Sequence, residues 1–131
     1  ELPDLLKWIP GWMKKNGATS RSALIVEPKA NGKDVVSSLK KSEKTRHLNV
    51  VEDDSVGTKR SKVSEANGIS YILESGKVLV PERGDWVPSF IHECVMFPNT
   101  KHDDRVDCLI GAVKKMIVNQ SGSRRMEMGN A

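Results

Sequence analysis

Three aspartates near the carboxyl end of the sequence are the residues best suited to chemistry. Asp103, Asp104 and Asp107 lie directly before a run of apolar and small residues. On a helix, Asp107 would share a face with both of the other aspartates. Like charges ~4 Å apart repel by ~4 kcal/mol at an effective dielectric of ~20, so a cluster this dense favours a divalent cation. Oxygen ligands favour Mg²⁺ or Mn²⁺ over zinc.

A solvated helix start is the alternative explanation for part of this cluster. The helix dipole favours acidic residues in a first turn, and Asp103 could be an ordinary amino-terminal cap. That alternative explains Asp103 and in part Asp104. It explains Asp107 poorly, because Asp107 lies one turn inside the expected helix. The pattern therefore favours a metal site.

Glu27 is a second carboxylate placed where burial is expected. It follows the β-rich apolar residues 23–26, and Pro28 ends the run. Ligands of open α/β sheets collect at the carboxyl ends of strands, so Glu27 would project into a site. Alternatively, Glu27 leaves the core and meets water or a lysine such as Lys29. Position alone leaves both explanations open.

Carboxylates of this kind suit phosphodiester hydrolysis. Two metal ions ~3.5–4 Å apart would activate a water molecule and stabilise the departing oxygen, while the carboxylates hold the ions. No nucleophilic side chain is required, so the lack of a Ser-His-Asp or Cys-His pattern is no objection. The sequence also has no Cys/His pattern with zinc spacing.

The elements that must position these residues alternate between strands and helices, which is typical of an α/β domain with helices packed on a mixed sheet. Helices are expected at 3–15, 33–40, 58–74, 85–96 and 103–118, and strands at 23–26 and 47–51, with an edge strand at 77–81. Pro10 should kink or interrupt the first helix. So few strands suggest that the amino-terminal strands of the sheet are missing.

Composition and charge set wider bounds. The 131 residues are expected to form one partial domain, with a flexible tail at 119–131. No segment approaches the ~18 apolar residues of a membrane span. Cys94 and Cys108 lie in apolar stretches and favour buried free thiols in a reducing cytoplasm. A net charge of +4 is compatible with a polyanionic partner but is weak evidence alone.

Five sequence blocks, in matching order and spacing, resemble the nuclease domain of bacteriophage large terminases. They are IVEPKANG at 25–32, GTKRSK at 57–62, ESGKVLVP at 74–81, the set Trp86, Phe90–Glu93 and Phe97–Pro98, and HDDRVD at 102–107. Together they span roughly residues 22 to 117. The resemblance implies a ribonuclease H-like fold and a two-metal DNA endonuclease that cuts concatemeric viral DNA during genome packaging.

Carried over by position, the resemblance makes Glu27 the second acid and Asp107 the last. Asp104 would be an additional ligand, and Asp103 ranks lower, as a cap or an outer contributor. The family's first acid comes from a strand upstream of Leu2, so activity is expected to depend on residues that this sequence does not contain. The alternatives are a non-catalytic DNA- or partner-binding module of a packaging motor, and a degenerate remnant without activity.

Basic residues near the acids are predicted to contact DNA, because a duplex that approaches an acidic cluster needs nearby cations and phosphate contacts position it without reading sequence. They are Lys59, Arg60, Lys62, Lys101 and Arg105. A solvated lysine face is preferred instead for residues 40, 41 and 44. The resemblance implies double-stranded DNA, the terminase ATPase domain, the small terminase and the portal as partners, in the cytoplasm of a bacterial host.

Overall fold

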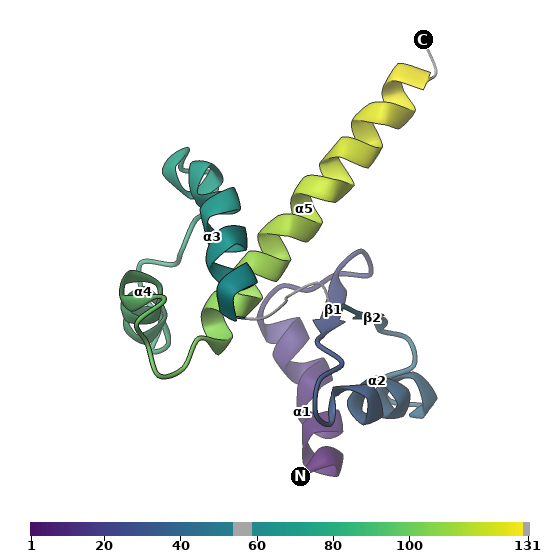
Figure 1. Cartoon of the computed structure of the whole chain (residues 1–131). Helices are drawn as coiled ribbons and strands as arrows, with labels where there is room; N and C mark the ends of the chain where they lie inside the picture. The colour runs from purple at the N-terminus through teal and green to yellow at the C-terminus, as the bar shows by residue number, and fades with distance from the viewer. Residues whose placement is uncertain (54–58, 130–131) are drawn as a thin grey trace. The chain divides into compact units, whose positions relative to one another are not determined.

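The computed structural model describes residues 1–53 and 59–129, with side chains described for residues 1–53 and 61–117. The chain divides into two compact units, Glu1–Asp54 and Ser55–Ala131, each with its own apolar core (Figure 1). Over the described residues the elements are α1 (Leu2–Lys15), β1 (Ala23–Val26), α2 (Gly32–Lys41), β2 (Asn49–Glu52), α3 (Lys59–Glu74), α4 (Val87–Met96) and α5 (Asp104–Gly129). A single partial domain over residues 1–131 stays a prediction.

The first unit is a parallel two-stranded sheet covered by helices. β1 pairs with β2 so that Leu24 lies opposite Val50 and Val26 opposite Glu52. Alternate strand residues point to one face, which brings Leu24, Val26 and Val50 to the same core. The helices complete that core with Ile9, Met13, Val36 and Leu39. The α/β prediction is confirmed in this coarse form, although the sheet is parallel where a mixed one was expected.

Helix α1 runs through Pro10 without interruption, so the break that Pro10 could have caused does not occur. Ile9 and Met13, one turn apart, are both buried in the core of the first unit. A proline inside a helix costs ~3 kcal/mol through its missing donor and its ring. Burial of two large apolar side chains offsets such a cost, since each stabilises by ~1.5–3 kcal/mol.

A tight turn links β1 to α2 and fixes the backbone of Glu27. The Asp53 N–H donates to the Val26 carbonyl at 3.0 Å, and the Gly32 N–H donates to the Lys29 carbonyl at 2.9 Å. A Cβ atom at Gly32 would fall on the backbone carbonyl oxygen of Glu27. Only glycine therefore allows the start of α2 to approach the end of β1 this closely.

The second unit consists of helices α3 and α4 packed against the amino-terminal part of α5 (Figure 1). Its buried core is Ile69, Val106, Ile110 and Val113. Val106, Ile110 and Val113 recur at the spacing of one face of a helix, as the sequence pattern predicts. Helix α5 continues to Gly129, beyond the end expected at Val118.

The predicted edge strand at 77–81 is wrong, because these residues have no regular secondary structure. A strand needs a neighbour for its hydrogen bonds, and the second unit has no strand among its described residues. The apolar residues Trp86, Phe90, Ile91 and Val95 of the helix expected at 85–96 are predicted by their spacing to face inward. This is wrong for Trp86, Ile91 and Val95, which are exposed. Glu93, Cys94 and Phe97 face the packed side of this segment instead. The expected burial of Cys108 is wrong as well, because this residue is exposed.

Replacing Gly32 with alanine is expected to destabilise the first unit by about 2 kcal/mol, because the added methyl group overpacks against the Glu27 carbonyl. Chemical denaturation would measure the loss. Gly11→Ala is the matched control, since a Cβ there meets nothing within 4 Å and lies inside α1. That control should be neutral or stabilising by up to ~1 kcal/mol. Equal stability of the two variants would contradict the role given to Gly32.

Candidate metal centre

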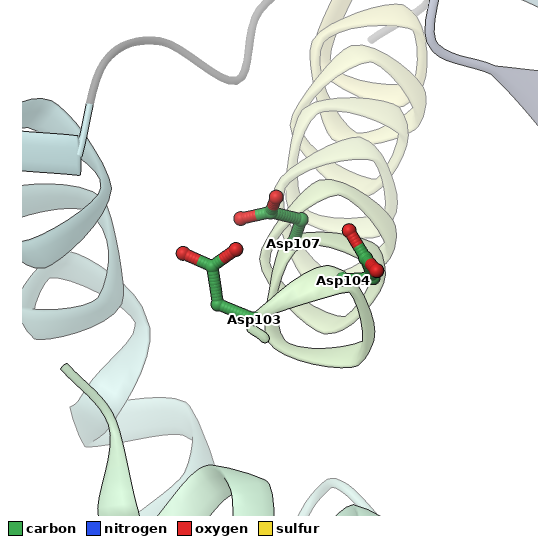
Figure 2. A group of neighbouring side chains, drawn as sticks. All are labelled: Asp103, Asp104 and Asp107. Carbon is green, nitrogen blue, oxygen red and sulfur yellow. The ribbon is translucent and has the colours of Figure 1, made fainter. Parts of the chain in front are cut away.

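The three predicted aspartates come together at the amino-terminal end of α5. Helix α5 begins at Asp104, and the Asp107 N–H donates to the Asp103 carbonyl at 2.9 Å, which closes its first turn. One possible ligand atom from each of the three aspartates lies within 4.8 Å of the others. Figure 2 shows the carboxylates of Asp103 and Asp107 beside one another, with that of the exposed Asp104 set apart from them.

Lys62, from the first turn of α3, places its ammonium group against two of these carboxylates. Nζ is 2.7 Å from Oδ2 of Asp107 and 3.4 Å from both carboxylate oxygens of Asp103. The side chains of Lys62 and Asp107 are only 14% and 15% exposed. The hydrogen bond to Asp107 raises the pKa of Lys62 above its ordinary value of 10.5, against the opposing effect of burial. The cluster therefore holds a fixed positive charge.

Glu93, from α4, caps the helix that carries the aspartates. Its Oε1 accepts hydrogen bonds from the backbone N–H groups of Arg105 at 2.8 Å and Val106 at 3.1 Å. Its Oε2 accepts one from Nη1 of Arg105 at 3.1 Å. The first N–H groups of a helix have no partner within the helix, and a carboxylate there is further favoured by the helix dipole.

The electrostatics of Glu93 reflect this role. Its side chain is only 6% exposed, and such burial alone would raise the pKa of the carboxyl group. The hydrogen bonds from Val106 and Arg105 outweigh that effect and hold the pKa below the ordinary value of 4.5. Because Glu93 serves as the cap, Asp103 directs its carboxylate to Lys62 instead. Glu93 was not among the residues predicted from the sequence, although a carboxylate within the apolar segment 90–97 was a signal for it.

A pocket beside the start of α5 carries basic side chains. This cavity of ≈ 430 Å³ is bordered by Lys101 and Arg105, which were predicted to contact DNA, and by His92 and His102. Lys101 is exposed, and the side chain of Arg105 stays half exposed although it is paired with Glu93. The pocket thus presents cationic groups at the start of α5, and none of the three aspartates lines it.

Glu27 forms an ion pair with a lysine of its own unit. Glu27 belongs to the first unit, where its Oε1 is 2.7 Å from Nζ of Lys29, as the lysine alternative anticipated. A shared metal ion between Glu27 and the aspartates stays a prediction. Lys59 and Arg60 open α3, but their side chains lie outside the described residues.

The donor set fits a hard divalent cation. Three carboxylates supply only oxygen ligands, which is the preference of Mg²⁺ and Mn²⁺. An ammonium group already binds two of them, which shows that the site attracts a cation. Asp103, Asp104 and Asp107 are therefore able to hold such an ion.

Comparison with known proteins identifies the family. The terminase RNaseH-like domain family matches residues 14–115, and the chain belongs to this family. The predicted resemblance to the terminase nuclease domain is thereby confirmed, and the match includes both Glu27 and the aspartates. No curated protein and no solved structure matches the chain. Within the described residues, no helix has the length and apolar character needed to cross a membrane.

Glu93→Gln is expected to lower the free energy of unfolding at neutral pH by about 2 kcal/mol, because a charged acceptor of three hydrogen bonds is lost. The lowered pKa means that Glu93 stabilises the fold above its unfolded-state value and that this contribution disappears as pH falls through the folded-state pKa. The difference between wild type and variant should therefore shrink below about pH 4.5. Denaturant unfolding of both proteins at a series of pH values from neutral to below about pH 4.5 measures this difference.

Glu82→Gln is the matched control, because Glu82 is exposed in the segment before α4. It should leave both the stability and its pH dependence close to those of the wild type. A Glu93→Gln protein as stable as this control at neutral pH would show that the cap contributes nothing.

Proposed function

We propose that this chain is the metal-dependent endodeoxyribonuclease domain of a phage packaging terminase, which cuts concatemeric viral DNA during genome packaging. The observation that carries the proposal is the group of three aspartates within 4.8 Å of one another on the first turn of α5. Its place within a chain of the terminase RNaseH-like family supports nuclease chemistry over other uses of such a cluster. The family match supports membership of the terminase RNaseH-like family, and cleavage of viral DNA is proposed in addition.

The proposed ligands of Mg²⁺ or Mn²⁺ are Asp104 and Asp107, with Asp103 contributing beside them. Glu27 is kept as a further acid on the sequence pattern and the family match. When bound, the metal supplies the activation of water and the stabilisation of the departing oxygen. The protein's own task is to hold the carboxylates in one fixed arrangement. The capping bonds from Glu93 serve that task at the start of α5.

Double-stranded DNA is the proposed substrate. Lys101 and Arg105 border the pocket at the start of α5, where they can contact phosphate oxygens without reading sequence. Lys59 and Arg60 are proposed as further contacts from the start of α3. The proposed partners in a complete packaging machine are the terminase ATPase domain, the small terminase and the portal.

A non-catalytic DNA- or partner-binding module is the second candidate. The observation in its favour is that two of the three predicted catalytic acids have a lysine as ion-pair partner: Asp107 with Lys62 and Glu27 with Lys29, each at 2.7 Å. Carboxylates neutralised in this way can serve the fold without a metal. The two candidates differ in what happens when the aspartates are replaced.

Asp107→Asn is expected to reduce Mn²⁺-dependent nicking of supercoiled plasmid by at least about a hundredfold, because a carboxylate ligand becomes a neutral amide. The assay uses this chain and a version extended upstream with its natural sequence. Asp85→Asn, in the exposed segment before α4, is the control for general loss of an acid and should keep its activity. If the extended protein is inert, or if Asp107→Asn cuts normally, the nuclease proposal is wrong.

Lys101→Gln is expected to weaken DNA binding and to lower the slope of log affinity against log salt concentration by about one, because one phosphate contact is lost. Fluorescence anisotropy with a labelled duplex in a salt series measures this slope. Lys40→Gln is the control, since Lys40 is an exposed lysine of α2 that is assigned to a solvated face. An identical slope for both variants would remove Lys101 from the DNA-contacting surface. Salt-sensitive binding by a protein without nicking activity would favour the second candidate.

A further inference from the structure

We infer that Lys62 is a built-in competitor of the divalent cation: its ammonium group occupies the carboxylates that the metal requires and must leave Asp107 before the metal binds. The inference rests on the proposed function, because it concerns the same aspartates. It adds a role for Lys62 that differs from a permanent DNA contact or a structural ion pair.

The contacts of Lys62 place the competition at particular atoms. Nζ donates to Oδ2 of Asp107 at 2.7 Å and reaches both oxygens of Asp103 at 3.4 Å. A Mg²⁺ ion binds a carboxylate oxygen at ~2.0–2.1 Å, so it cannot share Oδ2 with an ammonium group at hydrogen-bond distance without strong repulsion. Asp104, by contrast, is exposed and has its carboxylate set apart from the pair (Figure 2). The incoming metal can therefore meet Asp104 first and Asp107 only after Lys62 withdraws.

Charge balance allows the metal to approach. Three carboxylates and one ammonium group leave a formal charge of −2, which still attracts a divalent cation. Repulsion is local, because a cation on Oδ2 of Asp107 would lie close to an ammonium group that is held 2.7 Å from the same oxygen. The apparent metal affinity is therefore the intrinsic affinity multiplied by the fraction of molecules in which Lys62 has withdrawn from Asp107.

The side chain of Lys62 suits such an exchange. Lysine carries a compact charge on a flexible stem of four carbons, whereas arginine would hold the carboxylates through a rigid planar fork. A lysine anchored in the first turn of α3 stays near the aspartates after it withdraws. There it can meet a phosphate oxygen of the substrate, so that the DNA contact predicted for Lys62 would form in the metal-bound state.

Calorimetric titration of the full chain with Mn²⁺ alone tests the inference. Lys62→Gln is expected to bind Mn²⁺ about tenfold more tightly than the wild type, because the competitor is removed. Lys62→Arg should bind no more tightly than the wild type. Lys77→Gln is the general charge control, because Lys77 is an exposed lysine of the second unit. Lys114→Gln removes the Lys114–Glu65 ion pair, which has its own 2.8 Å contact in the second unit. Both controls should stay within about threefold of the wild type.

A second measurement needs no variant. The side-chain carbon and nitrogen signals of Lys62, followed by NMR during a Mg²⁺ titration, should move to the positions of a solvated lysine at saturation. Lys62 signals that stay unchanged at saturation would overturn the inference, as would equal tightening in Lys62→Gln and Lys77→Gln. In either case the proposed metal site would still stand. If neither the wild type nor Lys62→Gln binds Mn²⁺, the metal site of the proposed function fails, and the inference fails with it.

Discussion

Repulsion between carboxylates is the constraint on which the second unit depends. Three aspartates share the first turn of α5 and its flank, with possible ligand atoms within 4.8 Å, and two of them are largely buried. Such an arrangement is stable only with positive charge close by, because burial weakens the screening by water. The chain supplies that charge through the ammonium group of Lys62 and through the amide dipoles at the start of α5. The same excess of negative charge that destabilises the cluster also gives it affinity for a divalent ion.

Helix α4 provides the amino-terminal cap of α5. A helix that begins with acidic residues would ordinarily use one of them to satisfy its first N–H groups. Here Glu93 performs this function from a neighbouring helix, with two backbone hydrogen bonds of 2.8 and 3.1 Å. Asp103 is thereby left to interact with a cation rather than with the backbone. The buried carboxylate of Glu93 is thus structural, and the carboxylates it positions carry the chemistry.

The sequence predicted those structural features that depend only on residues close together in the chain. The spacing of Asp103, Asp104 and Asp107, and the apolar period of α5, follow from helix geometry alone and were confirmed as structure. The Lys62–Asp107 contact joins residues 45 positions apart, so no local pattern could reveal it. The expected edge strand failed for a related reason, since a strand requires a partner that its own sequence does not specify. The apolar residues of α4 were wrongly predicted to be buried. Their spacing shows that they share one face of the helix, but it does not show whether another element packs on that face.

The hydrogen bonds that Glu93 accepts at the start of α5 limit where related chains can vary in length. Glu93 and Arg105 are 12 positions apart, and the intervening segment must return the chain so that the carboxylate meets the helix end. An insertion there would withdraw the carboxylate and loosen the turn that holds the aspartates. The stretch between α3 and α4 lacks regular structure and provides none of the hydrogen bonds to the cluster or to the start of α5. Insertions and deletions compatible with an intact metal centre should therefore accumulate between α3 and α4, while the connection from α4 to α5 keeps a constant number of residues.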